Sequence, residues 1–250
     1  PEEAAVNKRK PVFVAGERKK TKKAEGAGPS STPGWNPGAN IPRGGVGRQV
    51  SYSSVPTGGK PYVAMTFDDG PHPTNTPRLL DILKKRNVKA TFYVVGSNAR
   101  RYPHIMRRMI AEGHEIGNHT DSHAYLTKIS QSEARNELVK AHQAIVSATG
   151  VAPRTVRPPY GAITSGQKSW IKSEFGYPSI MWSVDPEDWK KPGTGVVTSR
   201  LVNGANRGGI LLLHDIHASS VDATPAAVSQ LKRRGYEFVT ISQLIDLEPR

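Results

Sequence analysis

The sequence contains no cysteine among its 250 residues, which excludes disulfides, thiolate metal ligands and cysteine nucleophiles. It also lacks any run of about 18 apolar residues, so we expect no membrane-spanning segment. No signal-peptide pattern is visible, which leaves open a cytoplasmic protein or a sequence that begins after a removed leader. Hydrophobic residues make up only 36%, and this low share indicates that part of the chain lies outside a packed core.

Acidic residues are scarce as well, with 21 Asp and Glu against 35 Lys and Arg, and the formal net charge is +14. Residues 1–60 hold 11 of the basic and 4 of the acidic residues. Because this stretch is rich in Gly, Pro and Ser, it buries too little apolar surface to offset its ordering entropy. We expect residues 1–60 to be a basic extension or linker, either a solvated leader or an electrostatic tether to an anionic cell envelope.

From residue 61 onward, strand and helix patterns alternate about seven times. Strands are expected at 62–66, 90–95, 114–117, 155–156, 179–184, 209–213 and 237–241. Helices are expected at 75–86, 103–112, 131–149, 166–175, 196–205 and 224–234. This alternation predicts one α/β domain over residues 61–250, with a parallel sheet that is open or closed into a barrel.

Residues capable of chemistry follow five of the expected strands. Since the carboxyl ends of parallel strands converge on one face, these clusters are expected to meet there. The clusters are Asp68 with Asp69, His119 with His123, Arg157 with Tyr160, Asp185 with Asp188 and Trp189, and His214 with Asp215.

His119 and His123, together with one carboxylate of the Asp68–Asp69 pair, match a zinc site with an open position for water. Gly117 and Asn118 favour a turn over a helix for the two histidines. Adjacent residues at a strand end point in different directions, so one carboxylate can bind metal while the other faces the substrate. Each half has a plain alternative, because histidines often satisfy local polar groups and Asp-Asp-Gly-Pro is a common turn sequence.

His214 follows the most apolar strand, where low polarity can tune its pKa for a general acid. Asp215 is expected to orient a neighbour. His217 competes with His214 but lies further into the loop. Histidines 72, 104, 114 and 142 lack such partners and are expected to be structural or exposed.

Taken together, these residues resemble the NodB-type polysaccharide deacetylases of carbohydrate esterase family 4. The resemblance covers about residues 61–245 in five ordered motifs. These are Thr66-Phe-Asp-Asp-Gly-Pro71, His119-Thr-Asp-Ser-His123, Arg157-Pro-Pro-Tyr-Gly161, Asp185-Pro-Glu-Asp-Trp189 and Leu212-Leu-His-Asp215.

The resemblance implies a distorted (β/α) barrel and hydrolysis of N-acetyl groups from N-acetylglucosamine units of peptidoglycan or chitin-like chains. It implies Asp68 as the catalytic base, His214 as the acid, and Asp69, His119 and His123 as ligands of a divalent metal. Zinc suits these ligands best, although cobalt or nickel would also fit. On the substrate side, Arg157 would position the base and Asp188 would support Arg157 or His214. Tyr160 would line the site, and Trp189 and Leu212 would enclose the acetyl methyl group.

Two other functions remain open from the sequence. An O-deacetylase acting on acetylxylan would use the same residues, and a non-catalytic glycan-binding module would retain only the fold. A nucleic-acid partner is not expected, because the charge comes without a nucleic-acid-binding motif. A glycan-directed enzyme is expected outside the cell, in the periplasm or on the cell wall.

Overall fold

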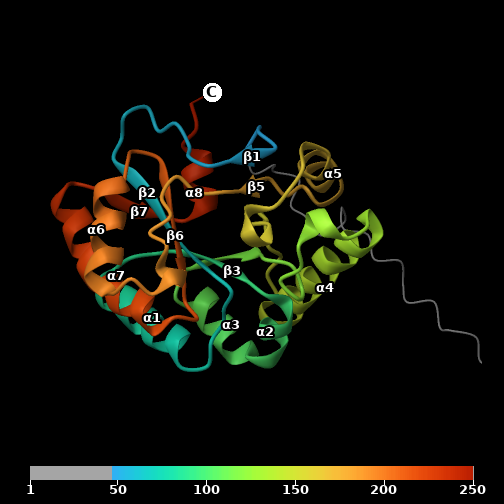
Figure 1. Ribbon diagram of the computed structural model, residues 1–250, viewed down its shortest axis with the longest axis horizontal. Coiled ribbons are helices and arrows are strands. Elements are labelled where there is room, and N and C mark those ends of the chain that lie inside the picture. The colour runs from blue at the N-terminus through green and yellow to red at the C-terminus, as the bar shows by residue number, and fades with distance from the viewer. Residues whose placement is uncertain (1–46, 250) are drawn as a thin grey trace, which may run out of the picture. The chain divides into compact units, whose positions relative to one another are not determined.

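The strand Tyr62–Asp68 (β2) lies at the centre of the computed structural model, which describes residues 47–249 (Figure 1). Six of its seven residues are buried. Val63, Met65 and Phe67 pack into one hydrophobic cluster, while Ala64 packs into another. A strand that buries both faces is typical of a parallel sheet covered on both sides.

Four further strands pair with β2 or its neighbours, all in parallel. The order is β4 (Glu115–Asn118), β3 (Thr91–Val94), β2 and β6 (Gly209–His214), and β7 (Glu237–Val239) pairs with the first half of β2. The register of β2 against β6 sets Asp68 opposite His214. Pairing alone therefore brings two of the expected chemical residues to the same edge.

Short pairings close the sheet into a ring. β1 (Ser51–Tyr52) pairs in parallel with β5 (Ser179–Ile180). Val156 bridges β4 to β5, and an antiparallel bridge between Ser54 and Gly209 returns to β6. The seven short strands thus form a distorted barrel, and the expected α/β architecture is confirmed.

Helices surround the strands on the outside in Figure 1. They are α1 (Asn75–Lys85), α2 (Gly96–Arg101), α3 (Pro103–Ala111), α4 (Gln131–Thr149), α5 (Ser165–Phe175), α6 (Thr194–Gly204), α7 (Ala218–Arg233) and α8 (Ile241–Asp246). Within residues 47–249, three single-turn 3₁₀ helices lie in loops, at Leu126–Lys128, Pro159–Gly161 and Asp188–Lys190. Ser130 forms a capping box with Glu133 at the start of α4, and Gly150 ends that helix in the left-handed conformation.

Several elements differ from the sequence expectation. The strand expected at 179–184 ends at Ile180, because the next residues bond to different partners: Met181 to Tyr52, and Ser183 and Val184 to Ile210. α7 begins six residues before the expected start and contains Pro225, since burial of its first turns outweighs the cost of proline. The helices α2 and α8 were not expected, because each has only six residues and is too short to show a helical period.

Residues 47–60, expected to belong to the extension, pack against the barrel. Tyr52 is 2% exposed and Val55 is 1% exposed, and β1 is part of the ring. The packed chain therefore starts before residue 61, because aromatic and branched residues in this short stretch supply core surface. The rest of the extension, residues 1–46, lies outside the described residues. No described helix has the length and apolar character of a membrane span.

This packing predicts that Tyr52→Ala lowers the free energy of unfolding by about 3–5 kcal/mol, as truncation of a large buried ring usually does. Denaturant titration of the purified protein measures the change. Val50→Ala is the matched control, because Val50 is 44% exposed and should cost less than about 0.5 kcal/mol. Equal effects of the two substitutions would show that residues 47–60 are not part of the cooperative unit.

Candidate active site

The end of β2 carries two adjacent carboxylates that diverge. Asp68 is the last strand residue, and Asp69 turns the chain with a φ of 75°. The following Gly70 must be glycine, because a Cβ there would lie 2.3 Å from the Asp215 carboxylate oxygens. Asp215 is fully buried and accepts a hydrogen bond from the Thr76 hydroxyl. Asp215 was expected to orient a neighbouring residue, and the side chain that it contacts is Thr76 on α1 rather than His214. Asp215 also packs against Gly70, in the turn that follows the two carboxylates.

His119 and His123 lie on the turn after β4, as the sequence indicated. Thr120 and His123 both have positive φ, so the segment is not a helix. The Nε2 atoms of His119 and His123 lie 3.3 Å and 3.1 Å from Asp69 Oδ1. The three predicted ligands therefore converge on one point, where their candidate ligand atoms all lie within 4.8 Å of one another.

Two sets of polar contacts from neighbouring helices stabilise this turn. Asp121 forms a bidentate pair with Arg100 of α2 at 2.6 and 2.9 Å. Glu137 of α4 accepts hydrogen bonds from the backbone N–H groups of Asp121 and Ser122. A turn with two left-handed residues is held by contacts that lie distant in sequence.

The donor set fits a divalent cation. Asp69 Oδ1 is buried and has no hydrogen-bond partner within residues 47–249. His119 Nδ1 lies 2.7 Å from the carbonyl of Arg157, which can only accept, so Nδ1 donates and the Nε2 lone pair faces Asp69. Two imidazoles and a carboxylate leave one position open, as in hydrolytic zinc sites.

Arg157 lies beneath Asp68 and is fully buried. Its Nη1 donates to Asp68 Oδ1 and to the Thr66 hydroxyl, each at 2.7 Å. Nε and Nη2 donate to the carbonyls of Ile180 and Met181. The guanidinium also stacks on the ring of Tyr93, 4.3 Å from its centroid. Arg157 does not reach the pocket, so it acts on the substrate side only through Asp68.

Asp188 supports His214 and not Arg157, which resolves the alternative that the sequence left open. Asp188 is fully buried and accepts from His214 Nδ1 and from its backbone N–H, both at 2.8 Å. The hydroxyl of Ser220 donates to the same carboxylate. Burial lowers the pKa of His214, but Asp188, with Asp68 and Asp69, raises it to about 9. The imidazole is therefore a cation at neutral pH, with Nε2 free to donate.

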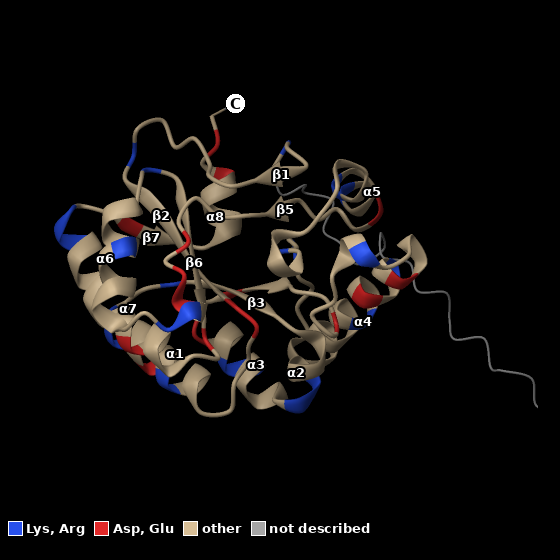
Figure 2. Cartoon of the chain, in the orientation of Figure 1, with Lys and Arg blue, Asp and Glu red and all other residues tan. Residues whose placement is uncertain are grey.

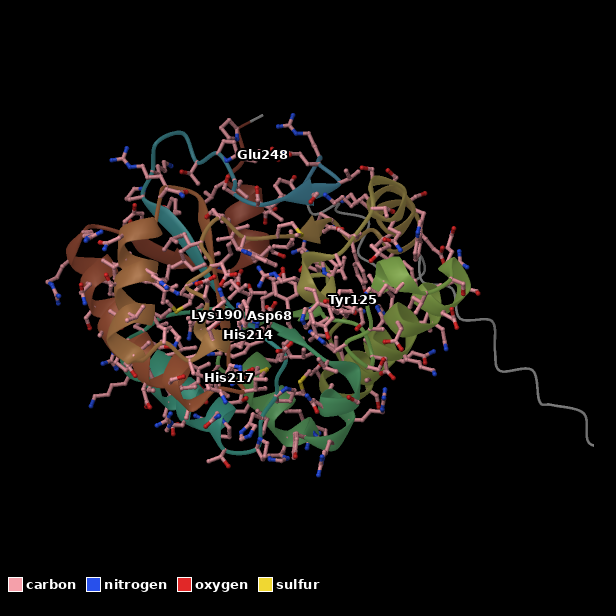
Figure 3. The ribbon with its side chains drawn as sticks, viewed as in Figure 1. Asp68, Tyr125, Lys190, His214, His217 and Glu248 are labelled. Atoms are coloured by element: carbon pink, nitrogen blue, oxygen red, sulfur yellow. The ribbon has the colours of Figure 1, made fainter. Side chains whose placement is uncertain are left out.

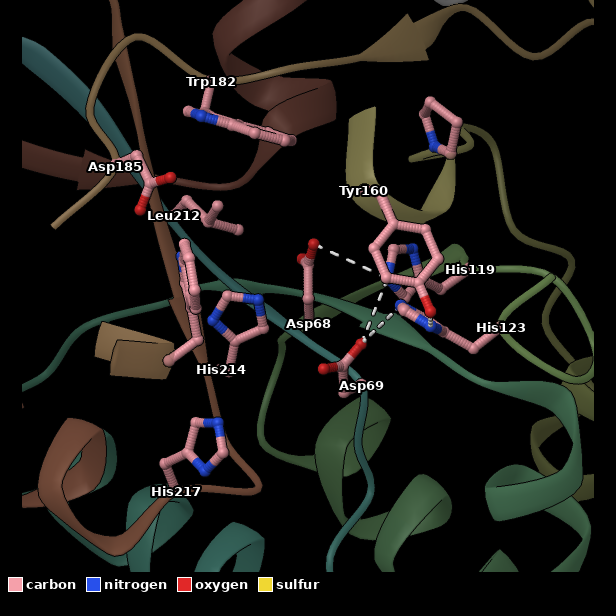
Figure 4. A pocket seen from close by; sticks show the side chains of 12 residues that line it. Asp68, Asp69, His119, His123, Tyr160, Trp182, Asp185, Leu212, His214 and His217 are labelled. Atoms are coloured by element: carbon pink, nitrogen blue, oxygen red, sulfur yellow. Dashed lines mark hydrogen bonds and ion pairs between the residues drawn. The ribbon is translucent and has the colours of Figure 1, made fainter. Parts of the chain in front are cut away.

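These side chains line a cavity of about 430 Å³ (Figure 4). In Figure 3, Asp68 and His214 lie close together near the middle of the molecule, and Figure 2 shows acidic segments gathered in the same region. The cavity contains every predicted site residue except the buried Arg157 and Asp188. Its lining is Asp68, Asp69, His119, His123, Pro158, Tyr160, Trp182, Asp185, Trp189, Leu212, His214 and His217.

Two aromatic residues at or near the cavity were not expected from the sequence. Trp182 lines the cavity near Leu212 (Figure 4), but it lay inside an expected strand, where an aromatic residue normally packs in the core. Tyr125 stacks on Tyr160 with ring centroids 3.7 Å apart, and the Tyr160 hydroxyl lies 3.1 Å from His123 Nδ1. No local pattern marks either residue, because both depend on loops that meet in space.

The pairing of Asp121 with Arg100 at the metal-binding turn predicts that Arg100→Met weakens zinc binding by about 10–100-fold, the usual effect of losing outer support for metal ligands. Titration of the metal-free protein with Zn²⁺ measures the dissociation constant. Arg107→Met is the control, because Arg107 is an exposed residue on α3. Unchanged affinity in Arg100→Met would mean that the turn holds its shape without the Asp121 pair.

The chain is similar in sequence to known deacetylases. The family model described as polysaccharide deacetylase matches residues 56–180. The chain is 45% identical over 182 residues to the peptidoglycan-N-acetylglucosamine deacetylase PgdA of Listeria monocytogenes, covering 73% of this chain and 38% of that protein. The chain thus spans well under half of that relative's length.

Two other relatives match over most of their own length. A chitooligosaccharide deacetylase of Bradyrhizobium sp. is 40% identical, covering 73% of this chain and 90% of that protein. The crystal structure of the Bc1960 peptidoglycan N-acetylglucosamine deacetylase superimposes with a TM-score of 0.75 at 38% identity, covering 80% of this chain and 95% of that one. Since the family model, the relatives and the fold agree, the chain belongs to the polysaccharide deacetylase family.

Proposed function

We propose that this protein is a metal-dependent hydrolase that removes N-acetyl groups from N-acetylglucosamine residues of peptidoglycan or chitin-like glycans and releases acetate. The observation that carries the proposal is the arrangement around one cavity of a carboxylate held by Arg157 and an imidazolium held by Asp188. The converging Asp69, His119 and His123 lie beside Asp68 in the same cavity. Relatives named for both kinds of glycan support this substrate range.

Asp69, His119 and His123 would hold the divalent cation, which we propose is zinc, with cobalt or nickel as alternatives. When bound, such a cation polarises a carbonyl and lowers the pKa of water. Asp68 uses one oxygen to accept from Arg157, which leaves Oδ2 to take a proton from the attacking water. The fixed pair places the base without side-chain reorganisation during the reaction.

The oxygen of that water forms a bond to the acetamide carbonyl carbon, and the bond from carbon to nitrogen then breaks. His214 donates its Nε2 proton to the departing amine, while Asp188 stabilises the imidazolium beforehand. The backbone N–H of Tyr160 is our candidate donor to the developing oxyanion. The products are acetate and a free amino sugar.

The apolar side of the cavity suits the acetyl methyl group. Leu212 and Trp189 line it together with Trp182, and a methyl group gains free energy when such surfaces remove it from water. Trp189 is 51% exposed, so part of its ring remains available to the sugar.

Acetate release from chitooligosaccharides, muropeptides and acetylxylan tests the proposal, with and without a chelator and after metal is restored. We expect release from N-acetylated glycans that chelation stops and metal restores. Release from acetylxylan alone would favour O-deacetylation, and no release from any glycan would contradict an enzymatic function.

The division of labour at the end of β2 predicts different losses for its two carboxylates. Asp68→Asn should lower kcat by about 10²–10⁴-fold, because it removes a proton acceptor, while bound metal remains near one equivalent. Asp69→Asn should instead weaken metal binding, since it replaces a charged ligand. Metal analysis after dialysis, together with initial rates, distinguishes the two; equal metal loss in both variants would refute these roles.

The Asp188 contact predicts the alkaline side of the pH–rate profile. Activity requires protonated His214, whose pKa is raised to about 9, so kcat/KM of the metal-saturated enzyme should fall as pH rises toward that value. In Asp188→Asn the negative charge is lost while burial still lowers the pKa of His214. The alkaline limb should then move to lower pH, and an unmoved limb would show that another group titrates.

A further inference from the structure

Four histidines line the cavity, and three of them have fixed partners. His119 bonds to the carbonyl of Arg157, His123 lies against the Tyr160 hydroxyl, and His214 bonds to Asp188. The fourth, His217, has no side-chain hydrogen bond within residues 47–249, although its imidazole lines the same cavity. Its two ring nitrogens are therefore available to a molecule that enters the cavity.

The backbone that carries His217 is nonetheless held in place. The carbonyl of Ile216 accepts from the side chain of Asn75, and Thr76 donates to Asp215. The His217 carbonyl accepts from the N–H groups of the first turn of α7. An unpartnered polar side chain on a fixed backbone is preorganised for a ligand, because binding costs little further ordering.

His217 lies away from the reacting groups. In Figure 4 it is on the far side of His214 from Asp68, and the rings of His214 and His217 are 6.1 Å apart. Burial and the cationic neighbours His214 and Lys191 lower the pKa of His217. A neutral imidazole offers one donor and one acceptor, which matches the hydrogen-bonding capacity of a sugar hydroxyl.

We propose that His217 is a substrate-binding residue that hydrogen-bonds a glycan hydroxyl outside the acetamide being hydrolysed. It thereby contributes to the choice of glycan rather than to the proton transfers. This role rests on the proposed deacetylase function. It differs from that of His214, which has the buried carboxylate partner that a general acid at neutral pH needs.

The test compares wild type with His217→Ala on the soluble glycan that wild type hydrolyses fastest. One hydrogen bond is worth about 0.5–1.5 kcal/mol, so KM should rise about 2–10-fold while kcat changes less than about twofold. His217→Gln, which keeps a donor and an acceptor, should recover part of the loss. His104→Ala is the matched control on an exposed histidine of α3. The His217→Ala variant is expected to fold, because His217 has extended backbone angles and its side chain does not cap α7.

An unchanged KM, or a kcat reduced a hundredfold, would overturn the role of His217. Absence of turnover in wild type would instead contradict the proposed function. Calorimetry with fully N-acetylated chitotetraose needs no turnover and compares Asp68→Asn with the Asp68→Asn/His217→Ala double variant. Weaker binding to the double variant supports the assignment, and equal or undetectable binding by both proteins counts against it.

Discussion

The buried pair between Arg157 and Asp68 organises the rest of the site. Removing a guanidinium and a carboxylate from water is costly, so the pair persists only because each nitrogen of the Arg157 guanidinium donates a hydrogen bond. The same residue accepts from His119 Nδ1 through its carbonyl and so orients a predicted metal ligand. Arg157 therefore holds both Asp68 and His119, the proposed base and one proposed metal ligand, which follow different strands.

At each end of the cavity, a buried charged residue pairs with a catalytic candidate of opposite charge. On one side a buried cation fixes a carboxylate, and on the other the buried Asp188 fixes the cationic His214. Each buried partner fixes the orientation of its catalytic neighbour through hydrogen bonds, and Asp188 also raises the pKa of His214. This separation of a base and an acid by environment lets both act at one pH.

Recognition of the glycan is divided between rigid and unpartnered groups. Trp182, Trp189 and Leu212 supply apolar surface near the acetamide, while Tyr160 is stacked on Tyr125. His217 adds a free hydrogen-bonding group on a fixed backbone. In the proposed function, such a surface would contact sugar rings through both their faces and their hydroxyls.

The sequence by itself determined the parallel α/β plan and the identity of the residues at the strand ends, because hydrophobic periodicity and strand-end position are local properties. Asp68, Asp69, His119, His123 and His214 were all expected together, and the structure gathers them around one cavity. Only the tertiary structure decided that Asp188 supports His214, that Asp121 pairs with Arg100 and that Trp182 faces the cavity. These contacts join residues about 20 or more positions apart or depend on where a strand ends, and local patterns encode which face is buried but not which faces meet.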